Sequence, residues 1–183
     1  RANTIEFNQI DLTAFLEEDY SVQAQSLQVT NQFLKTEYLN LKDLLPVKED
    51  RVKRITEELE RLNEILKKAN MQVGYRIRDE INFYVIEALD KELLAENTAF
   101  DKEILQKVLP RIQGSSVIIK EILLELFDFF TGSSFSKENG QLAAGVFNYY
   151  QANQETFKYP ESAEKIAYML RRFEEDGFTS YWL

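Results

Sequence analysis

Apolar residues recur every three or four positions along most of this chain, which is the spacing of one face of an α-helix. A first helical stretch begins near residue 30 and is expected to end at Pro46, because proline lacks the N–H group that a helix interior needs. A second helix follows Pro46 and is expected to end in a turn over residues 70–74. Its apolar stripe consists of Val52, Ile55, Leu59, Leu62 and Leu66.

Two more helices are predicted directly after this turn. One runs from residue 75 to about residue 94, with its apolar face set by Ile81 and Val85. The other begins within "NTAFDKE", where Thr98 or Asp101 is the candidate N-cap, and closes at Pro110.

The segment "SVIIKEILLELFDFF" is apolar on nearly every side, so we expect it to form the most buried helix, capped by Ser115. Residues 131–141 are rich in glycine, serine and polar side chains and are predicted to be a loop. Residues 142–159 fit either a helix or a strand-bearing segment. The last helix is predicted to begin at Pro160 and to stop at Gly177.

Strand signals are confined to the two ends of the sequence. "NTIEF", residues 3–7, alternates apolar and polar positions, and the tail "FTSYWL" has extended propensity. A single strand is not stable alone, so residues 3–7 are expected to pair with a distant segment or with residues outside this sequence. The predicted fold class is mainly α, a helical bundle with one or two short strands near the termini.

The amino-acid composition excludes several classes of function for this chain. The 183 residues contain 31 acidic and 22 basic side chains, and the net charge of -9 argues against general electrostatic binding of nucleic acid. There is no Cys and no His, which excludes Cys/His zinc sites, Ser-His-Asp triads and cysteine nucleophiles. Neither a signal peptide nor an apolar stretch long enough to span a bilayer is visible. We therefore expect a soluble cytoplasmic protein without a membrane partner.

Catalytic motifs are not evident in the sequence. The acidic residues fall mainly on polar helix faces, as in "EELERLNE", which favours a solvated surface over a pair of catalytic carboxylates. Neither "VGYRIRD" nor "TGSSFSKENG" has the spacing of a phosphate-binding loop. A complete nucleotide-hydrolysing site is therefore not predicted within these residues.

Two arginines, Arg76 and Arg78, follow Gly74 at the start of a predicted helix. Cations are usually favoured at the opposite end, because the helix dipole already places partial positive charge at the N-terminus. Asp79, Glu80 or carboxylates of the preceding helix are candidate partners for them. In the other interpretation, one arginine binds a phosphate as a bidentate cation. Composition and pattern leave both interpretations open.

The segment that contains these arginines is one of three that together resemble a known protein family. The sequence contains, in this order, "GYRIRDEI", "LQKVLPRIQGS" and "YPESAEKIAYMLRRFEEDGFTSYW". Together they resemble the carboxyl-terminal part of McrB-like AAA+ NTPases, the motor subunits of modified-cytosine-directed restriction systems. "RANTIEF" is similar to the junction that leads into the last strand of the family's α/β core. Each motif is short, and the resemblance rests on their order and spacing. It is strongest over residues 51–130 and from residue 159 onward, and weakest over residues 8–45.

The resemblance implies a division of the chain. Residues 1–10 would end the α/β core, and residues 11–130 would form a helical lid subdomain with an insertion near 11–45. A loop over residues 131–141 and a helical extension over residues 142–183 would follow. In this family the lid closes over a nucleotide and couples its hydrolysis to motion of a ring and to DNA translocation or restriction.

The resemblance also assigns roles to individual residues. Arg76 matches the "GYR" arginine and is expected to have a sensor-2-like role, contacting the γ-phosphate, with Arg78 as the alternative. Gly74 and Tyr75 complete the expected cofactor-binding segment. Arg1 matches an arginine of the core junction and is a candidate arginine finger.

The implied cofactor is ATP or GTP with Mg²⁺, bound by the full-length parent. Walker A, Walker B and sensor 1 are absent from these 183 residues, so no cofactor and no hydrolysis are expected for them alone. The implied partners are the chain's own AAA+ core, neighbouring subunits of a ring and a nuclease subunit, with DNA contacted through the parent. The alternative hypothesis is a stand-alone adaptor that binds another protein through its acidic and aromatic surface.

Overall fold

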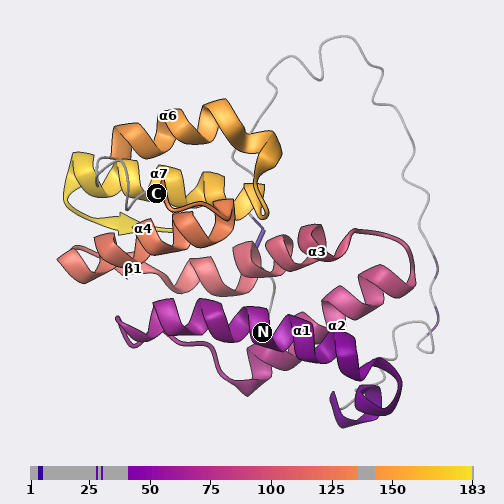
Figure 1. The fold of residues 1–183 in the computed structure, drawn as a ribbon. Coiled ribbons are helices and arrows are strands. Elements are labelled where there is room, and N and C mark those ends of the chain that lie inside the picture. The colour runs from indigo at the N-terminus through magenta and orange to yellow at the C-terminus, as the bar shows by residue number, and fades with distance from the viewer. Residues whose placement is uncertain (1–3, 6–27, 29, 31–40, 136–142, 183) are drawn as a thin grey trace.

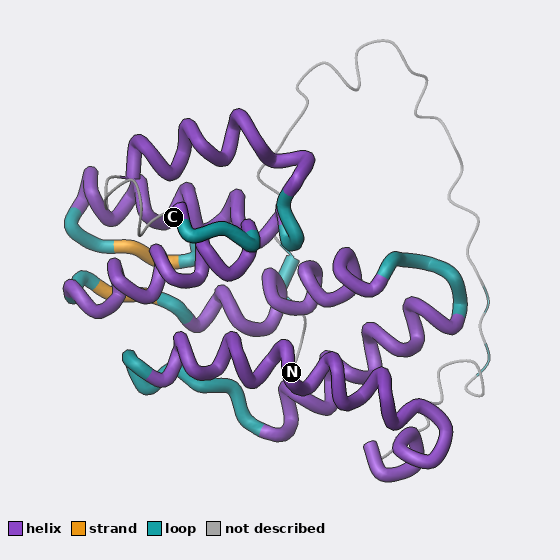
Figure 2. Tube along the Cα trace, viewed as in Figure 1, coloured by secondary structure: helices purple, strands orange, loops and turns teal. Residues whose placement is uncertain are grey.

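The protein is a mainly helical bundle, as predicted, and its computed structural model describes residues 4–5, 28, 30, 41–135 and 143–182. Figures 1 and 2 show its helices and two very short strands. The longer helices are α1 (Leu41–Lys67), α2 (Tyr75–Asp90), α3 (Glu96–Glu103), α4 (Val117–Thr131), α6 (Ala143–Asn153) and α7 (Pro160–Asp176). The shorter elements are η1 (Ile104–Val108), η2 (Leu109–Arg111), η3 (Gln154–Thr156), β1 (Gln113–Gly114) and β2 (Thr179–Ser180).

Helix α4 holds the bundle together. It packs against α7 on one side and α1 on the other, and α6 covers α7 farther out (Figure 1). Helix α2 packs against both α1 and α3, which places its N-terminus beside η1. The region that contains the predicted site is therefore held by α1, α3 and η1.

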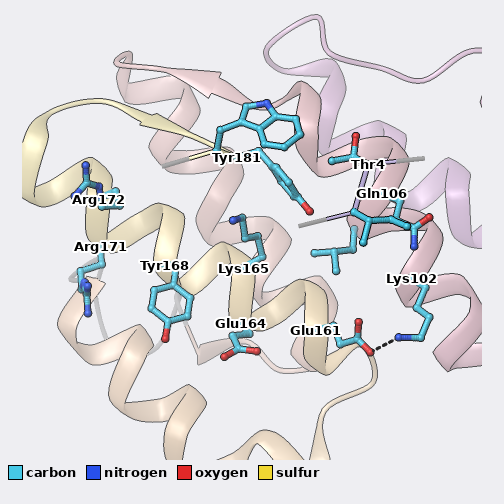
Figure 3. Close-up of a pocket in the computed structure, with 13 residues that line it drawn as sticks. Thr4, Lys102, Gln106, Glu161, Glu164, Lys165, Tyr168, Arg171, Arg172 and Tyr181 are labelled. Carbon is cyan, nitrogen blue, oxygen red and sulfur yellow. Dashed lines mark hydrogen bonds and ion pairs between the residues drawn. The ribbon is translucent and has the colours of Figure 1, made fainter. Parts of the chain in front are cut away.

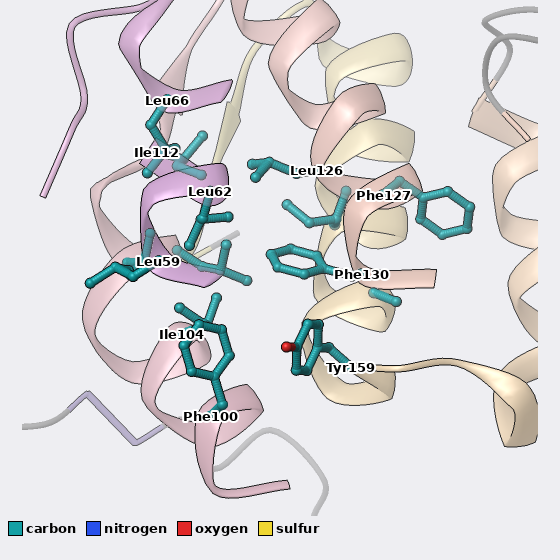
Figure 4. Close-up of a cluster of buried hydrophobic side chains, with 14 of the residues drawn as sticks. Leu59, Leu62, Leu66, Phe100, Ile104, Ile112, Leu126, Phe127, Phe130 and Tyr159 are labelled. Carbon is teal, nitrogen blue, oxygen red and sulfur yellow. The ribbon is translucent and has the colours of Figure 1, made fainter. Parts of the chain in front are cut away.

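The hydrophobic core forms one cluster that extends from α1 to the residues after α7. Figure 4 shows its centre, where Leu62, Ile104, Phe127 and Phe130 are fully buried. Nine residues of α4 are buried, which confirms the prediction for this helix. The proposed division of the chain near residues 130 and 141 stays a prediction, although side chains from both sides share this cluster.

Several helix ends confirm the sequence prediction. Helix α7 begins with Pro160, and Gly177 ends it in the left-handed conformation at φ 68°. Helix α1 ends before Asn70, whose φ is 56°, and the Met71 N–H donates to the Leu66 carbonyl at 3.1 Å. This six-to-one hydrogen bond is the Schellman arrangement that satisfies a carbonyl at a helix end.

Two predicted boundaries lie at other residues. The break expected at Pro46 is a kink at Lys48, where φ is -129° and ψ is 24°, and it joins two helical segments within α1. Helix α2 ends at Asp90 rather than near residue 94. Glu92 adopts a φ of 55°, and the Leu93 N–H then donates to the Ala88 carbonyl at 2.9 Å, which terminates the helix as at the end of α1.

The predicted N-caps were also wrong. Ser116, not Ser115, caps α4, because its Oγ accepts from the Ile119 N–H at 3.4 Å. The N-cap of α3 is Ala95, so Thr98 and Asp101 lie inside that helix.

The tail after α7 is extended, as predicted, and forms β2. β2 pairs antiparallel with β1, Gln113 opposite Ser180 and Gly114 opposite Thr179, and β1 was not predicted. Thr4 and Ile5 are in no strand, and the rest of the predicted strand over residues 3–7 lies outside the described residues, as does most of the 11–45 insertion. The ambiguous segment after residue 142 contains the helix α6.

Candidate functional site

The turn before α2 is fixed to α1 by Asn63. Its side-chain amide donates to the Val73 carbonyl at 3.0 Å, and its Oδ1 accepts from the Val73 N–H at 2.9 Å. Val73 itself is buried. These contacts set the position of Gly74 and therefore the direction in which α2 begins.

The N-terminus of α2 carries no negative charge. Gly74 is its N-cap and supplies no side-chain hydrogen bond, and the first turn contains no acidic residue. The Ile77 and Arg78 N–H groups donate to the Gly74 carbonyl at 3.0 and 3.2 Å. The positive end of the helix dipole is thus left without a capping carboxylate, the arrangement in which helix N-termini attract anions.

Arg76 lies on the surface at this helix end. Its side chain is 60% exposed, and its Nε donates to Oε1 of Glu80, one helical turn later, at 3.0 Å. Within the described part of the chain, its two terminal nitrogens donate to no protein group. The ion pair predicted as one alternative is therefore formed, but it uses only one of the three guanidinium nitrogens.

Glu80 also binds a second cation. Its Oε2 accepts from the Lys107 Nζ at 2.9 Å, and Lys107 comes from η1 with a side chain only 11% exposed. Burial acts to raise the pKa of Glu80, but the hydrogen bonds from Lys107 and Arg76 outweigh it and lower that pKa below its ordinary value. Glu80 therefore carries its negative charge between two cations over the neutral pH range.

Arg78 makes different contacts. Its Nε and Nη2 both donate to Oδ1 of Asp79, at 2.8 and 2.6 Å. Its guanidinium lies 5.0 Å from the ring centroid of Tyr75, whose own side chain is exposed. Both arginines thus use carboxylates of α2 itself, rather than those of the preceding helix.

The four predicted site residues from Gly74 to Arg78 lie together at the start of α2, and Arg1 lies outside the described residues. Lys107 was missed by the sequence prediction, because it is 27 residues away from Glu80 and no local periodicity connects them. In the described segments no group of three His, Cys, Asp or Glu side chains is placed to hold a metal ion.

A cavity of about 920 Å³ lies elsewhere, between η1, α7 and the residues after β2 (Figure 3). None of the predicted site residues that the structure describes lines it. Three of its cations are already paired: Lys102 with Glu161, Arg171 with Glu175 and Arg172 with Asp176. Two buried polar atoms in its lining residues, Gln106 Oε1 and Arg172 Nε, have no hydrogen-bond partner among the described residues.

Comparison with known proteins gives a family but no activity. The family model described as "Domain of unknown function (DUF8727)" matches residues 21–178. No curated protein and no solved structure matches the chain. Among the helices that the structure describes, none has the length and apolar character needed to cross a membrane.

Proposed function

Because the chain belongs to the family described as Domain of unknown function (DUF8727), its role has to be inferred from its own residues, and we propose that it is the lid subdomain of an AAA+ NTPase. In this proposal the bundle closes over a nucleoside triphosphate bound by an α/β core, and Arg76 contacts the terminal phosphate. The proposal joins the McrB-like resemblance of the sequence to the geometry at the start of α2.

The observation that carries the proposal is the exposed Arg76 side chain at a helix N-terminus without an acidic cap, with its terminal nitrogens unpartnered among the described residues. Two parallel N–H donors of a guanidinium match two oxygens of a phosphate, and this bidentate contact is stronger than a single neutral hydrogen bond. The adjacent backbone N–H groups add partial positive charge at the same place. The side chain is anchored to Glu80 through Nε, and its two terminal nitrogens have no protein partner among the described residues.

The proposed cofactor is ATP or GTP with Mg²⁺, and it supplies the phosphoryl group that is transferred to water. The phosphate loop and the metal ligands are proposed to belong to the core, while this chain contributes Gly74, Tyr75, Arg76 and Arg78. The McrB-like resemblance suggests further partners, which we include in the proposal. They are neighbouring subunits of a ring and a nuclease subunit, with DNA contacted by the parent protein. Arg1 would act as an arginine finger between ring subunits. A motor of this kind would work in the cytoplasm, for restriction or other antiphage defence.

The first test replaces Arg76 by alanine in the full-length protein. We expect NTP hydrolysis to fall at least about tenfold, because a positioned cation that offsets charge on the transferred phosphoryl group is lost. The melting temperature is expected to stay within about 2 °C, since an exposed ion pair contributes little to stability. Steady-state hydrolysis and thermal unfolding of the same preparations provide both measurements.

Arg54→Ala is the matched control. Arg54 is similarly exposed, at 58%, and also pairs with one carboxylate, that of Glu96, but it lies on α1. We expect its replacement to leave hydrolysis unchanged. Equal turnover in wild type and Arg76→Ala, or the absence of a phosphate loop upstream of Arg1 in the full-length protein, would contradict the lid proposal.

Tyr75 offers a second test of the same site. Its side chain is 80% exposed and has no role in the core, but one face of its ring lies against Arg78. If the other face contacts the nucleotide base, Tyr75→Ala is expected to raise KM for the nucleotide roughly fivefold, whereas Tyr75→Phe keeps the ring and the affinity. A Phe variant as weak as the Ala variant would show that stacking is not the contact.

An adaptor role is the second candidate, and one surface favours it. Val117, Phe178 and Trp182 are 72%, 41% and 62% exposed, and they lie near the pairing of β1 with β2. Exposed apolar side chains mark a protein-binding surface where they form a contiguous patch, and the adaptor proposal requires that these three do so. The lid proposal needs a phosphate loop in the same polypeptide, whereas the adaptor proposal does not. Whether the sequence upstream of Arg1 contains such a loop therefore distinguishes the two candidates.

A further inference from the structure

We propose that Glu80 and Lys107 act together as positioning residues that aim the terminal nitrogens of Arg76 outward. This inference rests on the proposed function, and it gives Glu80 and Lys107 a positioning role that neither the sequence motifs nor the family assigns to them. Neither Glu80 nor Lys107 is proposed to touch the nucleotide. Their effect on hydrolysis passes entirely through Arg76.

Glu80 binds a different cation with each of its two oxygens. Oε1 accepts from Arg76 Nε at 3.0 Å, and Oε2 accepts from Lys107 Nζ at 2.9 Å. A carboxylate with both oxygens available commonly takes two parallel hydrogen bonds from one arginine. Because Lys107 occupies Oε2, Glu80 holds Arg76 through Nε alone and leaves the Nη1 and Nη2 pair for another ligand.

Lys107 is suited to occupy Oε2 of Glu80 because the fold restricts the position of its side chain. It lies in η1, a turn of π-helix whose Ile104 and Val108 are buried in the core. Its side chain is 11% exposed, so the ammonium has few alternatives to Glu80. Turns of π-helix are rare and are frequently found at functional sites.

The charges around Arg76 fit an incoming anion. Glu80 lies between Arg76 and Lys107, while Asp79 is engaged by Arg78. These five side chains sum to a charge of +1, from three cations and two carboxylates, in a chain whose net charge is -9. Lys107 also keeps Glu80 neutralised if Arg76 shifts toward a phosphate, so that movement leaves no unpaired carboxylate.

The test is a double-mutant cycle in the full-length protein, with Glu80→Gln, Arg76→Ala and the double variant. Glutamine keeps the shape of Glu80 and removes its charge. We expect Glu80→Gln to lower kcat about fivefold with KM nearly unchanged, since a misplaced catalytic cation mainly affects the transition state. In the Arg76→Ala background the same change is expected to have no further effect, because residues that act through one another are not additive.

Lys107 gives an independent readout. We expect Lys107→Met to lower kcat, because Oε2 becomes available and Glu80 can draw an Nη group of Arg76 into a two-point contact. Lys107→Arg keeps a cation at Oε2 and is expected to restore most of the activity. The matched control is Glu87→Gln, which removes another i,i+4 carboxylate partner from α2, that of Lys91, and should leave kcat unchanged.

The outcomes separate the two proposals. If Arg76→Ala lowers hydrolysis and Glu80→Gln does not, the positioning inference is wrong and the lid proposal stands. If Glu80→Gln lowers kcat equally with and without Arg76, Glu80 acts by another route and the inference is again wrong. If Arg76→Ala has no effect on hydrolysis, both proposals are overturned.

Discussion

Replacing Leu123 by aspartate is expected to abolish cooperative folding. Leu123 is fully buried in α4, the helix that packs against both α1 and α7. The substitution removes apolar contacts worth about 2–5 kcal/mol and buries an unpaired carboxylate at a cost of several kcal/mol more. Domains of this size are stable by about 5–15 kcal/mol in total, so the folded state should be largely lost. Circular dichroism during thermal unfolding would show no sigmoidal transition.

Val117→Asp is the control on the same helix. Val117 is 72% exposed in the first turn of α4, where a carboxylate also interacts favourably with the helix dipole. The free energy of unfolding of the Val117→Asp variant should stay within about 0.5 kcal/mol of the wild-type value, as is usual for surface substitutions. A normal melt for Leu123→Asp would mean that α4 is not at the centre of the core.

Asp101→Ala is expected to destabilise the protein by about 2–4 kcal/mol, because it leaves buried hydrogen-bond donors unsatisfied. Asp101 lies in α3 but caps α7: its Oδ2 accepts from the Glu161 N–H at 2.9 Å and its Oδ1 from the Ser162 N–H at 3.0 Å. Tyr159, at the N-cap of α7, supplies no side-chain cap. Asp101 also joins two helices that are about 60 residues apart in sequence, and urea unfolding would measure its contribution.

Asp90→Ala provides the contrast. Asp90 accepts from both Lys48 and Arg51 at 2.8 Å, but its side chain is 36% exposed and satisfies no backbone group within the described ranges. We expect a much smaller loss of stability than for Asp101→Ala, because surface ion pairs are screened by water and salt. A larger effect at Asp90 than at Asp101 would contradict the importance of the buried cap.

The pH dependence of the Asp101 contribution has a definite sign. Burial raises the pKa of Asp101 above its ordinary value, although hydrogen bonds from Ser162 and Glu161 act to lower it. A carboxyl with a raised folded-state pKa contributes most below its unfolded pKa of about 4, and this contribution is lost as the pH rises through the folded pKa. The stability difference between wild type and Asp101→Ala should therefore shrink with rising pH. If the difference instead grew with rising pH, the hydrogen bonds to Asp101 would have lowered its pKa by more than burial raises it.

At the start of α2, the sequence predicted the positions of the site residues but not all of their partners. The order Gly74, Tyr75, Arg76, Arg78 was enough to place these residues at a helix N-terminus, and the choice of carboxylate partners remained open. The structure pairs Arg76 with Glu80 and Arg78 with Asp79. It also adds Lys107, which shares Glu80 and which no local pattern connects to this helix. Arg1 stays a prediction, because it lies outside the described residues.

By itself, the sequence determined the helical class, the buried character of α4, and the limits of α7 at Pro160 and Gly177. These features follow from residues close together in the chain, through apolar spacing and through the backbone preferences of proline and glycine. Only the tertiary structure decided that Asp101 caps α7, that β1 pairs with β2, and that Lys107 holds Glu80. Each of those contacts joins groups 27 or more residues apart, and a hydrogen bond forms only when packing of the core brings donor and acceptor to within about 3 Å.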